Sequence, residues 1–96
     1  MREIFFSTKC VVNDEDEELK LDYYITVGEV VFEGGASFES YGVKIVMTRE
    51  NGEKEETQIN DIFVNLLEID ELIMLLSRCT VTPMSLYEIM DDYLAG

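Results

Sequence analysis

The chain has 96 residues, of which 21 are Asp or Glu and seven are Lys or Arg; its formal net charge is −14, and it contains no histidine. Because like charges repel, this balance argues against nucleic acid, anionic membranes and phosphate-rich ligands as direct partners. The missing histidine removes the commonest general base and the commonest metal ligand. We therefore expect no catalysis, no cofactor and no metal site.

The length predicts one domain over residues 1–96, and the apolar fraction of 47 % is enough for a core. No apolar stretch approaches the roughly 20 residues of a membrane span, and the first residues lack the apolar region of a signal peptide. Cys10 and Cys79 match no metal or redox spacing. We interpret them as reduced, buried thiols of a cytoplasmic protein.

The first part of the chain is rich in aromatic and β-branched residues that alternate with polar ones, the period of a strand. It predicts four strands, over 3–12, 19–32, 37–50 and 53–59. A charged turn at 13–18, Gly34-Gly35 and Asn51-Gly52 separate them, and the last pair is typical of a type I′ hairpin. The fourth strand is polar, which suits an edge guarded by charge.

The two-residue period assigns a core-facing side to each of the first three strands. These residues are Ile4, Phe6, Cys10 and Val12, then Leu19, Leu21, Tyr23, Ile25 and Val27, then Tyr41, Val43, Ile45 and Met47. The opposite face also carries apolar side chains, namely Phe5, Val11, Tyr24, Val30, Phe38 and Val46. That spare face predicts a homodimer interface, a curled sheet whose own edges and loops cover it, or a face with ordinary scattered apolar residues.

The pattern changes to a helical one in the last third, with helices predicted over 66–79 and 83–94. Asn65 and Glu68 resemble a capping box, and Thr82-Pro83 suits an N-cap followed by the first helical position. The apolar stripes consist of Ile69, Leu72, Ile73, Leu76 and Cys79, and of Leu86, Ile89, Met90, Tyr93 and Leu94. The first helix is apolar nearly all round, and we expect the excess to pack on the second.

Four strands connected by short hairpins and followed by two helices favour an α+β fold. We expect a four-stranded antiparallel meander followed by two C-terminal helices packed on one sheet face. In such a meander the first and third turns emerge at the same end of the sheet. This places nine carboxylates together: Asp14, Glu15, Asp16, Glu17, Glu18, Glu50, Glu53, Glu55 and Glu56.

This acidic rim, as we call those nine residues, has two interpretations. It is either a docking surface for a basic protein partner or a solvated, solubilising rim. It lacks the alternating ligands and central glycine of a calcium-binding loop. Our leading hypothesis is a non-catalytic protein-binding or regulatory module that uses the acidic rim and the spare sheet face. The alternatives are an acidic mimic of nucleic acid and, with least support, a small metal binder or enzyme.

Residues 40–94 also resemble a family of small proteins of unknown function from anaerobic Gram-positive bacteria. The similarity lies in the strand Tyr41-Gly42-Val43-Lys44-Ile45, in the helix Glu71-Leu72-Ile73-Met74-Leu75-Leu76, and in the helix that starts at Thr82-Pro83 and ends in Asp91-Asp92-Tyr93. The resemblance implies the fold and a bacterial origin. It implies no activity, because the family has none assigned.

Overall fold

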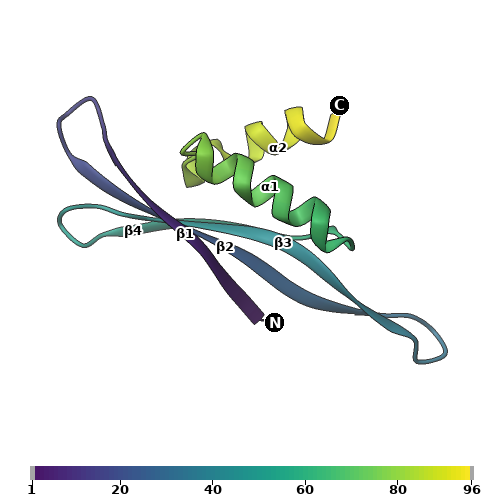
Figure 1. Ribbon diagram of the computed structural model, residues 1–96. Coiled ribbons are helices and arrows are strands. Elements are labelled where there is room, and N and C mark those ends of the chain that lie inside the picture. Colours follow the sequence, from purple (N-terminus) through teal and green to yellow (C-terminus); the bar gives the residue numbers. More distant parts are fainter. Residues whose placement is uncertain (1, 96) are drawn as a thin grey trace.

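The computed structural model describes residues 2–95 as one antiparallel sheet with two helices on one of its sides (Figure 1). The elements are β1 (Arg2–Val12), β2 (Glu18–Val31), β3 (Ser37–Thr48), β4 (Lys54–Phe63), α1 (Leu66–Arg78), the 3₁₀ turn η1 (Pro83–Ser85) and α2 (Leu86–Ala95). The strand order is β1-β2-β3-β4. This confirms the predicted α+β meander. Within residues 2–95, no helix is long and apolar enough to cross a membrane.

The core lies between α1 and the two central strands. Leu21 and Tyr23 of β2 and Ile45 of β3 have no exposed surface. They face the buried stripe of α1, which includes Ile69 and Leu72. Strands β2 and β3 keep the two-residue period along their length, and their predicted core faces are confirmed.

Strand β1 departs from that period at a bulge. One extra residue stands between Phe5 and Ser7 in the pairing with β2, so the faces exchange beyond it. Val11 therefore packs against the core, although the sequence placed it on the spare face. Cys10 and Val12 lie on the open side and are exposed, which corrects their assignment to the core.

Both cysteines are exposed and neither is in a disulfide, so the prediction of buried thiols is wrong. The bulge in β1 turns Cys10 away from the helices. Cys79 lies one residue beyond the end of α1, where its N–H donates to the Leu75 carbonyl and closes the helix.

Strand β4 continues to Phe63, beyond the predicted end at residue 59, because a wide bulge interrupts its pairing rather than ending it. Residues 60–62 stand opposite Gly42, and Asp61 has a positive φ of 56°. The Thr26 hydroxyl donates to Asn60 Oδ1 at 3.3 Å, and the Ser40 hydroxyl donates to Asp61. This bulge buries Thr26 and Ser40 on the open face of the sheet.

A buried hydrogen bond fixes the sheet to the connection after α1. The Tyr23 hydroxyl donates to the Val81 carbonyl at 2.9 Å. Burial raises the pKa of Tyr23 to about 12, and the charge of Cys79 adds to the effect.

The capping interactions predicted for the two helix N-termini are only partly present in the structure. Asn65 caps α1, accepting from the N–H groups of Leu67 at 2.8 Å and Glu68 at 3.4 Å, but Glu68 makes no return bond within the described chain. Thr82 makes no side-chain cap, and Pro83 begins a 3₁₀ turn before α2.

The expected packing of the apolar excess of α1 against α2 is wrong for three side chains. Leu66, Leu67 and Met74 are 49 %, 72 % and 58 % exposed. The first turn and the outer face of α1 thus present apolar surface to solvent.

Gly42→Ala should be strongly destabilising. A Cβ at this position would lie 2.1 Å from the Ile59 carbonyl oxygen and 2.7 Å from Asn60 Cα, so the β4 bulge must move. We expect a loss of about 3 kcal/mol in urea unfolding, typical of overpacking. At Gly28 a Cβ meets only ordinary contacts at 3.5 Å or more, so Gly28→Ala is the matched control and should change stability little.

Tyr23→Phe should cost about 1–2 kcal/mol, because the buried Val81 carbonyl loses its donor. The folded-state pKa of about 12 lies above the ordinary tyrosine pKa of 10.0, so the neutral phenol stabilises the fold fully below pH 10. As pH rises from 10 to 12, the wild type should lose about 1.4 kcal/mol per pH unit that the variant retains. Urea titrations of both proteins across this range test it, and parallel curves would contradict it.

Candidate functional site

The two acidic turns lie side by side at one end of the sheet, opposite the β2–β3 hairpin (Figure 1). Each is a three-residue loop, closed by Asn13 N to Glu17 O at 3.0 Å and by Arg49 N to Glu53 O at 2.8 Å. Its last residue has positive φ, 59° at Asp16 and 89° at Gly52. The predicted type I′ turn at residues 51–52 is therefore wrong, because it needs positive φ at both positions.

Two contacts join the turns and confirm that they meet. The N–H of Glu18 donates to Glu50 Oε1 at 2.9 Å. Arg49 lies between the strands, with Nη1 2.8 Å from Glu17 Oε1 and Nη2 3.6 Å from Glu55 Oε1. These contacts hold the acidic rim as one surface.

The carboxylates of the acidic rim fall into two groups. Glu17 and Glu55 pair with Arg49, and Glu56 pairs with Lys44 at 3.6 Å. The other six are exposed and form no ion pair with the described residues: Asp14, Glu15, Asp16, Glu18, Glu50 and Glu53. We call these six the uncompensated rim. Nowhere in residues 2–95 are three or more carboxylate or thiol groups arranged to hold a metal ion.

The open face of the sheet is covered near its centre by its own polar side chains. Lys44 bonds Glu3 at 3.0 Å, and the Thr8 hydroxyl donates to Asp22 Oδ1 at 2.5 Å. The hydrogen bond to Glu3 raises the pKa of Lys44 despite an opposing effect of burial. Val46, below this layer, is only 9 % exposed.

The remaining apolar residues of the predicted dimer face are spread out. Phe5 is exposed and its ring meets that of Tyr24 edge-on, with centroids 5.6 Å apart. Val30 and Phe38 are half-buried and belong to the part of the β2–β3 hairpin that extends beyond β1 and β4. On that hairpin the Phe32 and Phe38 rings lie 5.0 Å apart.

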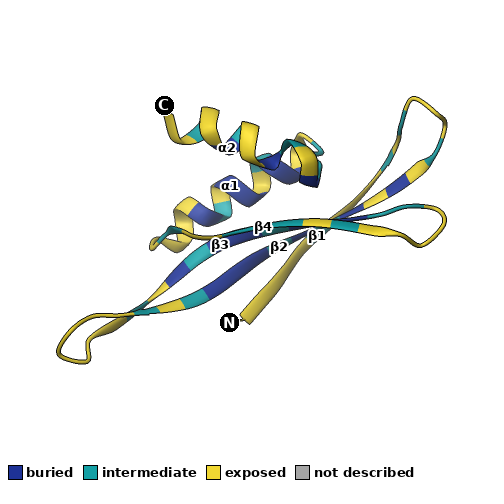
Figure 2. Ribbon diagram, turned by 180° about the vertical axis from the view of Figure 1, so that it is seen from behind, coloured by how far each residue is buried: buried dark blue, intermediate teal, exposed yellow. Residues whose placement is uncertain are grey.

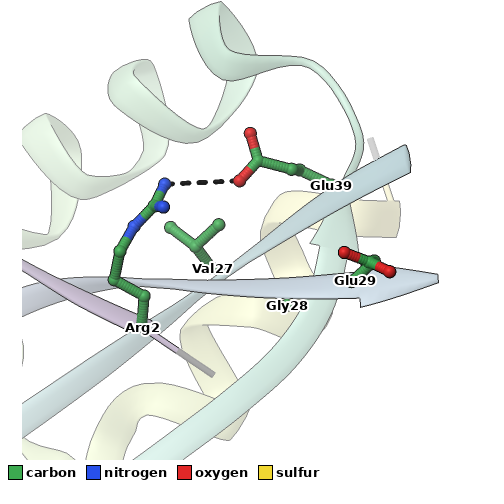
Figure 3. Close-up of a pocket in the computed structure, with 5 residues that line it drawn as sticks. All are labelled: Arg2, Val27, Gly28, Glu29 and Glu39. Atoms are coloured by element: carbon green, nitrogen blue, oxygen red, sulfur yellow. Dashed lines mark hydrogen bonds and ion pairs between the residues drawn. The ribbon is translucent and has the colours of Figure 1, made fainter. Parts of the chain in front are cut away.

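One surface hollow of about 260 Å³ lies where β1 begins, beside the base of the β2–β3 hairpin (Figure 3). Arg2 reaches past Val27 to Glu39, with Nη2 and Oε2 3.3 Å apart, and Gly28 and Glu29 complete the lining. Both charged partners are largely exposed, so their pairing contributes little to stability.

A second hollow of about 320 Å³ lies between β1 and α1. We call it the edge pocket, and it is lined by Phe6, Ser7, Lys9, Met74, Ser77 and Arg78. Sequence reasoning missed it, because its two sides are about 70 residues apart and the bulge that exposes Phe6 beside Ser7 leaves no mark in the alternation. The available signal was the apolar excess of α1 at Met74.

The model of a family of unknown function (DUF6514) matches residues 2–96, so the chain belongs to that family. The match covers nearly the whole chain and confirms the expectation of a family of unknown function. No curated protein and no solved structure matches the chain.

Asp16→Gly should stabilise the protein by about 1 kcal/mol, because glycine adopts positive φ without the penalty of a Cβ. The same change removes one charge from the acidic rim. Asp14→Gly removes an equal charge at a position without positive φ, and it separates the two effects. Thermal or urea unfolding should show the gain for Asp16→Gly alone, and an equal gain in both variants would assign it to charge.

Proposed function

We propose that this member of the family is a non-catalytic protein-binding module that docks a basic segment of a partner protein on the uncompensated rim. The observation that carries the proposal is the set of six exposed carboxylates without ion pairs, on two turns joined by the Glu18–Glu50 hydrogen bond and by Arg49. A cytoplasmic location in an anaerobic Gram-positive bacterium is part of the proposal.

The energetics of exposed charges define what the partner must provide. A single exposed ion pair contributes about 0–1 kcal/mol, so one lysine would not bind stably. Several carboxylates on one surface attract a basic segment at long range and raise its association rate. The partner should therefore carry several Lys or Arg residues within the span of the two turns, and binding should weaken with salt.

Charge distribution favours docking over mimicry of nucleic acid. A mimic needs carboxylates spaced along the body like phosphates. Here nine of the 21 acidic residues gather at one end of a molecule whose longest dimension is 54 Å. Such a pole suits a compact basic segment better than a groove that holds an extended nucleic acid.

Neutralising the uncompensated rim should abolish partner capture. The rim variant changes Asp14, Glu15, Asp16, Glu18, Glu50 and Glu53 to Asn or Gln. The control variant makes the same changes at six exposed acids elsewhere: Glu29, Glu33, Glu71, Glu88, Asp91 and Asp92. Both variants have the same net charge, so they separate the local surface from overall acidity.

Immobilised wild type, rim variant and control variant would each be exposed to bacterial lysate at low salt and eluted with a salt gradient. We expect a basic protein on the wild type and the control variant that is absent from the rim variant. The interaction would then be measured with the purified partner. Equal capture by all three proteins, or loss from both variants alike, would contradict the proposal.

A further inference from the structure

The edge pocket contains positive charge that the rest of the chain leaves without a partner. Of the seven Lys and Arg residues, Arg2, Lys20, Lys44 and Arg49 each form an ion pair. Lys9, Lys54 and Arg78 form none with residues 2–95, and two of these three, Lys9 and Arg78, line the edge pocket. A chain with three acids for every base thus places two uncompensated cations at one site, and no acid lines it.

The same pocket has an apolar wall. Phe6 is 38 % and Met74 58 % exposed, and both line the hollow. Behind them, the hydroxyl oxygens of Ser7 and Ser77 are 2.6 Å apart and connect β1 to α1. The pocket therefore fits a ligand with an apolar group next to a carboxylate.

The main chain beside the pocket is the outer edge of the sheet. Strand β1 has 11 residues and pairs only with β2, so its other edge is free to hydrogen-bond. Its first five residues are all exposed and include Ile4 and Phe5 (Figure 2). Both edge strands contain a bulge, but the stretch of β1 that follows its bulge, residues 7–12, has Lys9 as its one charged side chain, whereas β4 carries Lys54, Glu55, Glu56 and Asp61.

We propose that the edge of β1 binds an extended acidic segment of a partner protein as a fifth strand. An apolar side chain of that segment enters between Phe6 and Met74. A carboxylate two residues along the segment reaches Lys9 and Arg78, because alternate residues of a strand share a face. The site is separate from the acidic rim and selects the opposite charge.

A second copy of this chain fits the edge less well. The strand that it would add is β1, whose only acid is Glu3. Glu3 already bonds Lys44 at 3.0 Å, on the open side of the sheet and away from the edge pocket. The added strand would bring the Lys9 of the second copy close to Lys9 and Arg78 of the first, and it would supply no free carboxylate to either. A partner segment that contains its own acidic residue can hydrogen-bond to the edge of β1 and also pair with the two cations of the edge pocket.

The test uses a capped, fluorescein-labelled peptide, Thr-Val-Thr-Leu-Thr-Glu-Thr-Val-Thr, and a version with leucine and glutamate exchanged to cover both strand directions. Fluorescence anisotropy with the full chain should show saturable binding of one of them. Replacing the glutamate by glutamine should weaken binding about tenfold, the effect of losing hydrogen bonds between charged groups. The double variant Lys9→Gln/Arg78→Gln should show the same loss, and the exposed control Lys20→Gln/Lys54→Gln should bind like the wild type.

Two further measurements separate strand addition from other modes. Two N-methylated peptides would be made, one methylated at the odd-numbered backbone nitrogens and the other at the even-numbered ones. Only one of the two should lose binding, because alternate N–H groups of a strand face its neighbour. The proposal is overturned if neither peptide binds, if both double variants bind alike, or if neither methylated peptide is impaired. It is also overturned, in favour of a second copy, if sedimentation shows a wild-type dimer that the peptide cannot dissociate.

Discussion

The packing of a short helical layer, centred on α1, against a long sheet determines most of what this protein exposes. Helix α1 has 13 residues, a length of about 20 Å, whereas the molecule extends over 54 Å. Its buried stripe, which includes Ile69 and Leu76, covers the middle of β2 and β3. The acidic turns extend beyond this cover at one end and the β2–β3 hairpin at the other (Figure 1). Every candidate site lies where the helical layer stops.

The sequence predicts the parts of the fold that follow a regular period and misses the parts where the period breaks. The alternation in β2 and β3, the Asn65 cap and the order of elements are local or topological features, and they are confirmed. The bulge near Phe6 reverses the faces of the rest of β1, which moved Val11 into the core and Cys10 out of it. The β4 bulge depends on Gly42, whose missing Cβ admits the Ile59 carbonyl. No pattern within one strand reveals such a tertiary requirement.

The candidate sites divide in the same way. Meander topology alone predicts that the first and third turns meet, and the Glu18–Glu50 hydrogen bond shows that they do. The distinction between compensated and uncompensated carboxylates is not readable from sequence, because it depends on where the Arg49 side chain points. The edge pocket needs both the bulge and the placement of Arg78 across about 70 residues of chain. Sequence therefore locates surfaces that local charge creates, and misses those that tertiary packing creates.

The positions of the few cations determine which parts of the surface carry uncompensated negative charge and which carry uncompensated positive charge. Arg49 and Lys44 are themselves partly shielded and each is paired with carboxylates, so neither of these partly buried charges is left uncompensated. The exposed acids of the rim are left to solvent, which makes them available to a basic partner. Lys9 and Arg78 form no ion pair with residues 2–95, although acids outnumber bases threefold. A segment with the wrong charge would meet repulsion at either surface, so the two proposed sites would select ligands of opposite charge.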